Sequence, residues 1–128
     1  MKSLSKLLII LAITKSIFAQ SGYGFYFITD CDNSYEEQYG SYCLAVVSNV
    51  ARFDDCSPGR LGGCQKTLFG MDVEDRYSSK FNPMDTRMKL KDSFSKARKE
   101  RARKIKDYKS KSNYTVKRMY VGEYFEGN

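Results

Sequence analysis

The sequence predicts an α+β fold, in which a small disulfide-stapled β-rich domain carries one long basic helix and a C-terminal strand. Three observations support this prediction. Four cysteines lie between residues 31 and 64, apolar and aromatic runs alternate with turn-forming residues in the first half, and the charge changes sign abruptly near residue 86.

Residues 1–19 have the pattern of a cleavable export signal. Lys2 and Lys6 flank the start of an apolar run, and Ala19 supplies the small residue that a signal peptidase requires. A membrane anchor or a buried helix is disfavoured, because the run is short and Lys15 interrupts it. We therefore expect a secreted protein whose mature chain starts at Gln20 and is long enough for one domain.

Export predicts the state of the cysteines. An even number of them in an oxidising compartment favours two disulfides, with all three pairings open, and the residues are Cys31, Cys43, Cys56 and Cys64. A zinc site is disfavoured because the spacers are 11, 12 and 7 residues long and the chain has no histidine. We expect no metal ion and no other cofactor.

Residues 20–86 form the disulfide-containing, β-rich part. Aromatic and β-branched residues predict strands at 23–29 and 42–50, and 66–71 is a candidate third strand. Five basic residues stand against ten acidic ones, which gives this part a net charge of −5.

Residues 87–128 are expected to belong to the same domain. Asn82, Pro83 and Asp85 form a helix-start pattern, so a helix should begin at about Pro83. Its narrow apolar stripe is continuous if Arg101 bridges a gap, and consists of Leu90, Phe94, Ala97, Ile105 and Tyr108. Residues 114–121 should form the C-terminal strand.

The predicted helix is strongly basic. From Arg87 to Arg118 there are fourteen basic residues and three acidic ones. Their densest run is a candidate anion-binding or nuclear-import site, formed by Lys96, Arg98, Lys99, Arg101, Arg103, Lys104 and Lys106. Nucleic acid, a sulfated glycan or an anionic lipid surface would suit it as a partner. The alternative is a solvated helix face with its side chains in water.

Other functional classes have little support in the sequence. A lytic helix needs a broader apolar face, and sequence-specific DNA reading needs a second helix or leucine heptads. Without histidine, the common hydrolase triads and pairs are excluded. A carboxylate-based hydrolase stays open formally, but no spacing selects an acid and a nucleophile among Asp30, Asp32, Glu36-Glu37, Asp54-Asp55, Asp72, Glu74 and Asp75.

Two processing motifs occur in the basic part. Asn113-Tyr114-Thr115 is an N-glycosylation sequon, which makes Asn113 a candidate glycan acceptor in an exported chain. Lys117-Arg118 would fit cleavage by a proprotein protease, although the strand expected through Arg118 disfavours it.

In layout, this chain resembles the small secreted candidate effectors of plant-associated fungi and other parasites. The shared features are an export signal, about a hundred mature residues, two expected disulfides, many tyrosines and phenylalanines, and a basic run. The aromatic-x-cysteine signature of the powdery mildew group is absent, since Thr29 precedes Asp30-Cys31. The resemblance implies delivery to a host and interference with its defence, often through a host protein. We therefore expect a non-enzymatic virulence protein, whose basic run would bind an anionic polymer or direct import into the host nucleus. The alternative is a cationic extracellular defence, toxin or matrix-binding protein that acts at cell surfaces.

Overall fold

The computed structural model describes residues 20–32, 42–56, 63–77 and 80–126. The expected export signal at 1–19 and the Glu36-Glu37 pair lie outside these residues. The elements follow in the order β1 (Gln20–Asp32), β2 (Tyr42–Ser48), β3 (Ala51–Cys56), η2 (Gly63–Gln65), α3 (Lys66–Tyr77), η3 (Pro83–Asp85), β4 (Arg87–Lys91), α4 (Phe94–Lys109), β5 (Tyr114–Met119) and β6 (Tyr124–Glu126). The mixed α and β character is confirmed, but two α-helices are described where one long helix was predicted.

The long strand β1 is the centre of a six-stranded sheet. It pairs antiparallel with β2 through 27–32 and with β3 through 20–24. It also pairs antiparallel with β4 through 23–27. Parallel partners extend the sheet on the other side, since β5 joins β2 and β6 joins β3. The basic second half of the chain is therefore built into the same sheet as the acidic first half.

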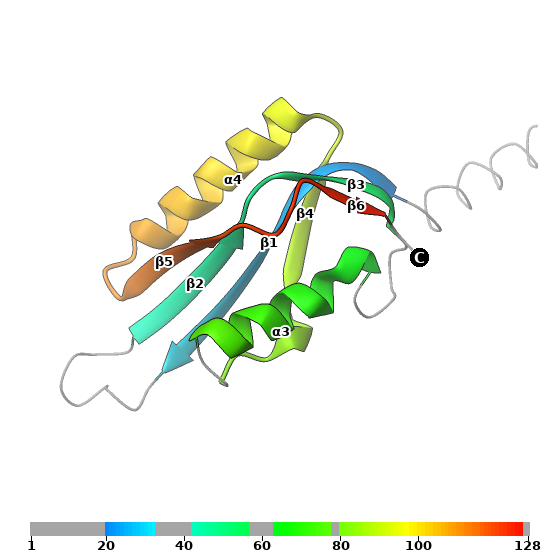
Figure 1. The fold of residues 1–128 in the computed structure, drawn as a ribbon. Helices are drawn as coiled ribbons and strands as arrows, with labels where there is room; N and C mark the ends of the chain where they lie inside the picture. Colours follow the sequence, from blue (N-terminus) through cyan, green and yellow to red (C-terminus); the bar gives the residue numbers. More distant parts are fainter. Residues whose placement is uncertain (1–19, 33–41, 57–62, 78–79, 127–128) are drawn as a thin grey trace, which may run out of the picture.

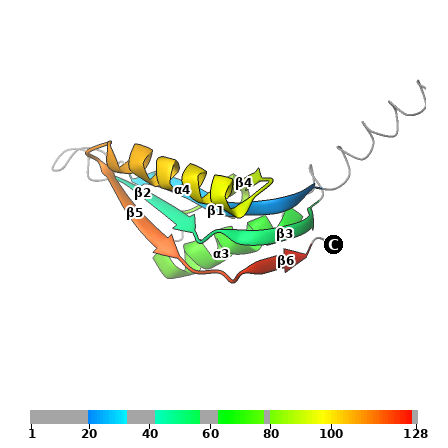
Figure 2. The same ribbon diagram turned by 90° about the horizontal axis from the view of Figure 1, so that it is seen from above.

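Helices cover both faces of this sheet (Figures 1 and 2). Phe25 and Phe27 of β1 belong to the core beneath α4, whereas Tyr26 and Ile28 belong to the core beneath α3. A strand buried on both faces needs apolar side chains at successive positions, not only at alternate ones. This explains the uninterrupted run Phe25-Tyr26-Phe27-Ile28.

Residues 66–71 do not form the third strand that we predicted. They begin α3, which buries Phe69 and Val73 against the sheet. A short apolar run fits a buried strand and a buried helix equally well, so its local pattern could not decide. Gly70 fixes the position of this helix, because a Cβ there would lie 2.6 Å from the Cα of Pro83.

The helix predicted from Pro83 begins eleven residues later. Asn82 does cap a turn, because its side chain accepts a hydrogen bond from the amide of Met84 at 3.1 Å, but the turn is only the 3-10 element η3. The backbone of Thr86 is extended, and β4 follows. Leu90, which we placed on the helix stripe, lies in β4 and packs on the α3 side of the sheet.

All four cysteines are paired, which confirms the two predicted disulfides and selects one of the three pairings. Cys31 and Cys43 face each other in the β1–β2 ladder and are bonded. Cys56 and Cys64 join the end of β3 to η2, just before α3. The second bridge therefore ties α3 to the sheet that it covers.

Candidate anion-binding site

The site is organised by α4, which lies along one face of the sheet. Ser93 caps the helix by accepting a hydrogen bond from the amide of Lys96 at 3.2 Å. Ala97, Ile105 and Tyr108 are the buried residues of the helix, as their spacing predicted. Burial raises the pKa of the Tyr108 hydroxyl to about 12. The remaining faces of the helix carry the basic side chains.

Arg101 bridges the gap in this apolar stripe, and it does so by turning toward the sheet. Its Nε donates a hydrogen bond of 2.7 Å to the backbone carbonyl of Ser48, at the end of β2. Burial lowers the pKa of the Arg101 guanidinium, and the nearby charge of Arg118 lowers it further. Arg101 therefore does not belong to a helix face that is open to water.

Lys104 is the second of the seven predicted residues that is held against the sheet. Its ammonium lies 4.6 Å from the centre of the Phe27 ring and 5.4 Å from that of Tyr108. Burial lowers the pKa of this lysine first, and the positive charges of Lys89 and Arg87 lower it further. An anion at this place would relieve the repulsion among these cations.

Glu100 is the main internal counterion of the helix. It pairs with Arg103 one turn along the helix and with Lys89 of β4, whose Nζ lies 3.2 Å from its Oε1. The hydrogen bond from Arg103 is the chief cause that lowers the pKa of Glu100 to about 2. Lys96 is paired with Asp92 at 3.1 Å. These contacts neutralise part of the predicted run.

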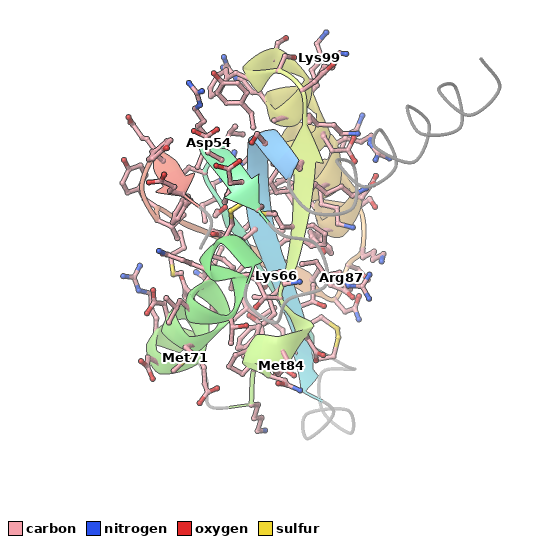
Figure 3. The ribbon with its side chains drawn as sticks, turned by 90° about the vertical axis from the view of Figure 1, so that its right-hand side faces the viewer. Asp54, Lys66, Met71, Met84, Arg87 and Lys99 are labelled. Atoms are coloured by element: carbon pink, nitrogen blue, oxygen red, sulfur yellow. A yellow bond between two sulfur atoms is a disulfide. The ribbon has the colours of Figure 1, made fainter. Side chains whose placement is uncertain are left out.

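Arg98, Lys99 and Lys106 are exposed, and no contact with another side chain is described for them within residues 20–32, 42–56, 63–77 and 80–126. Lys99 and Lys106 are seven residues apart, and therefore two turns apart on the outer side of the helix. Figure 3 labels Lys99 on the outer end of α4. The seven predicted residues thus form three groups. Arg98, Lys99 and Lys106 point outward, Lys96 and Arg103 are paired with carboxylates, and Arg101 and Lys104 lie against the sheet.

Sequence reasoning missed the basic residues that the sheet adds to this side. In β4, the sequence Arg-Met-Lys-Leu-Lys alternates, so that Met88 and Leu90 pack toward α3 while Arg87, Lys89 and Lys91 occupy the α4 side. Arg118 is added from β5, on the same strand face as Val116. The basic face is the name used here for the eight basic residues of α4 together with Arg87, Lys89, Lys91 and Arg118. The alternation of basic and apolar residues at 87–91 could have predicted this strand. We did not use it, because we expected a helix to cover these residues.

A cleft opens beside the first half of α4, between the helix and the strand ends at 49–52 and 120–123. Its volume is about 540 Å³. The arginine–aromatic cleft, as we call it, is lined by three arginines and three aromatic rings, namely Arg52, Arg98, Arg101, Tyr23, Phe94 and Tyr120. Glu123 is the one carboxylate in its lining.

A second hollow, of about 650 Å³, lies at the other end of the basic face. Cations from three elements line it, since Lys66 begins α3, Arg87 begins β4 and Lys104 belongs to α4. Figure 3 shows Lys66 and Arg87 next to each other. Asp85 is the carboxylate in this lining. Each of the two hollows beside α4 is therefore lined by three cationic side chains and one carboxylate.

A group of three acidic residues lies on the opposite side of the sheet. Asp72, Glu74 and Asp75 all belong to α3. Asp72 and Asp75 line a hollow of about 770 Å³ between α3 and the segment that joins β5 to β6. Asp54 is instead engaged by the Tyr124 hydroxyl at 3.0 Å and by Arg52 at 3.5 Å. In the described part of the chain, no three histidine, cysteine or acidic residues lie where they could hold a metal ion.

Asn113, the candidate glycan acceptor, lies in the turn between α4 and β5. Its side-chain amide is half-buried and lies 3.7 Å from the sulfur of Cys43, and its carbonyl accepts a hydrogen bond of 2.8 Å from the Cys43 amide. A glycan on this nitrogen would replace one of its two N–H groups and leave the other for the sulfur contact. Glycosylation of Asn113 stays a prediction.

Comparisons with protein families, with curated proteins and with solved structures found no significant match to this chain. Among the described residues, no helix has the length and apolar character needed to cross a bilayer. The chemistry of the surface is therefore the basis for proposing a function.

Proposed function

We propose that this protein is a small, secreted, non-enzymatic effector that acts on a host and binds an anionic polymer through its basic face. The observation that carries the proposal is the separation of charge across the sheet. The basic face has twelve basic residues with Asp92, Glu100 and Asp107 among them, and Arg52 and Glu123 line its cleft. On the α3 side, the three carboxylates of α3 are accompanied by Lys66, Arg76 and Lys117.

A one-sided charge distribution differs from the scatter that solubility alone requires. Basic residues from α4, β4 and β5 reinforce one another, and their summed field attracts and orients a polyanion before contact. Each phosphate or sulfate that the face neutralises also releases counterions, which makes binding sensitive to salt.

The placement of α4 favours recognition by a folded surface over a linear import signal. Arg101 and Lys104 are held against the sheet, so a receptor that reads an extended basic segment would find them engaged. Of the other parts of the proposal, the two disulfides support secretion alone, because disulfides persist in oxidising compartments. Action on a host and import into its nucleus stay predictions.

The experiment compares two double variants that remove the same charge from different faces. Lys99→Gln with Lys106→Gln alters the outer row of α4, and Arg76→Gln with Lys117→Gln alters exposed residues on the other side of the sheet. On duplex DNA the first variant should reduce the slope of log affinity against log salt by up to about 1.8, because each lost phosphate contact removes about 0.9. The second variant should keep the parental slope.

Heparin retention should follow the same order. Equal effects of the two double variants would show that net charge alone matters, and an absence of binding to both polymers would remove the proposal. Accumulation of the tagged protein at the surface of target cells, and not inside them, would favour the extracellular defence or matrix-binding alternative.

A further inference from the structure

The arginine–aromatic cleft points to a more specific ligand than a generic polyanion. We propose that it binds a single-stranded nucleic acid, with bases stacked on Tyr120 and Phe94 and phosphates held by Arg98 and Arg101. This inference rests on the proposed function and deepens it.

The aromatic rings are the first part of the argument. Tyr120 follows β5 with 70% of its surface exposed, and Phe94 begins α4 with 49% exposed. Phe94 is held by an edge-on contact with Tyr23, whose ring centre lies 5.9 Å away. Large apolar rings that are left in water beside a cleft are available for contact with a ligand, and every nucleobase presents a flat π-face for stacking.

The arginines are the second part. The Nε of Arg101 is used by the carbonyl of Ser48, and this bond fixes the guanidinium at the edge of the cleft. Within the part of the chain that the structure describes, the four N–H groups on its two Nη atoms have no acceptor, and they can donate to phosphate oxygens. Arg98 lines the same cleft one turn earlier on α4. Arg118 is close enough to Arg101 to lower its pKa, so the positive charge continues from the cleft onto β5.

The combination of rings and arginines separates single strands from other polyanions. In a duplex the bases are already stacked on one another, so they cannot stack on Tyr120 without being extruded. A sulfated glycan offers negative charge but no base, and it would use the basic face without needing this ring. Interleaved cationic and aromatic side chains are the usual composition of single-strand binding surfaces.

The test measures the affinity of the full secreted protein, in its oxidised form, for three probes. These are a fluorescently labelled single-stranded oligonucleotide, the same sequence as a duplex, and heparin. Tyr120→Ala should weaken single-strand binding roughly 5- to 150-fold, the range expected for the loss of one stacked base. Heparin and duplex affinity should change less than about twofold, because the charge is unaltered.

Two further variants serve as controls. Tyr120→Phe should restore single-strand binding, because the ring is retained. Tyr42→Ala removes another exposed ring at the far end of the β1–β2 ladder and should have no effect. Since Tyr120 is so exposed, its replacement should leave the folded state intact, and a circular dichroism melt checks this.

The outcomes distinguish this inference from the proposed function. Unchanged single-strand affinity in Tyr120→Ala, or equal affinity of the parent for single strand and duplex, would overturn the stacking assignment while leaving polyanion binding in place. Salt-dependent heparin binding without single-strand binding would overturn it in favour of a sulfated glycan. Failure of the parent to bind any of the three probes would overturn both proposals.

Discussion

Replacing Arg101 by glutamine should destabilise the protein, although Arg101 belongs to a run that the sequence presents as solvent-exposed. The variant loses the 2.7 Å hydrogen bond from Nε to the Ser48 carbonyl. Hydrogen bonds from charged donors contribute about 1.5–3 kcal/mol to stability. Burial and the repulsion from Arg118 offset part of this contribution, as the lowered pKa of Arg101 indicates.

We therefore expect the lower end of the range for Arg101→Gln, a loss of about 1.5 kcal/mol. In a domain of roughly a hundred residues the loss corresponds to a fall in Tm of about 6–7 °C. Urea denaturation followed by circular dichroism measures the change, with Lys99→Gln as the matched control on the outer side of the same helix. The control should stay within about 0.5 kcal/mol of the parent. Equal stability of the two variants would refute the inward placement of Arg101.

Three further predictions concern packing, covalent bonding and pH. Gly70→Ala should lower the free energy of unfolding, measured by urea denaturation, by about 1–3 kcal/mol, because the added Cβ would lie 2.6 Å from the Cα of Pro83. A gain in stability of about 0.5–1 kcal/mol, as helix propensity alone would give, would contradict the tight docking of α3. Replacing Cys31 and Cys43 together by serine should lower the unfolding free energy by about 3 kcal/mol, since their bridge spans a sequence separation of 12. An unchanged midpoint of urea denaturation, measured without reductant, would show that this disulfide does not form. The pKa of Glu100 is lowered from its ordinary value of 4.5 to about 2 in the folded protein. Its ionised carboxylate therefore stabilises the fold above about pH 4.5, and this stabilisation is lost as the pH falls toward 2. Glu100→Gln should flatten the decline of stability over that interval, and an identical acid dependence would contradict the pairing.

The strands that could be predicted are those in which local pattern and tertiary role agree. The aromatic run at Tyr23 to Thr29 lies within β1, and the segments at 42–50 and 114–121 contain β2 and β5. The prediction that all four cysteines form disulfides required only their even number and an oxidising compartment. Their pairing required the register of β1 and β2, which places Cys31 opposite Cys43.

The errors arose where a correct local signal was overruled by distant pairing. Asn82 caps a turn as its residue type suggests, yet β1 offers a free edge to residues 87–91, and the ladder with Tyr23 to Phe27 replaces a continued helix. The run at 66–71 is too short for the spacing of its apolar residues to distinguish a strand from a helix. The short strands β3 and β6 are stabilised by pairing, β3 with β1 and β6 with β3. These partners are distant in the sequence, so the local residue pattern does not reveal them.

The same reason limited the prediction of the site. Charge density located α4, but not the direction of each side chain on it. Arg101 and Lys104 turned out to pack on the sheet, and the cleft joins Phe94 to Tyr120 across 26 positions of sequence. Only the folded sheet brings these residues together.

We propose that anionic polymers bind to the α4 side of the sheet. The most direct test of this proposal is a two-dimensional NMR titration of the isotope-labelled protein with heparin oligosaccharide or oligonucleotide, whichever binds more tightly. Amide shifts should concentrate in α4, in β4 and around Arg118, whereas those of Asp72 to Tyr77 in α3 should stay unchanged. Shifts spread evenly over both sides of the sheet, or centred on α3, would contradict it.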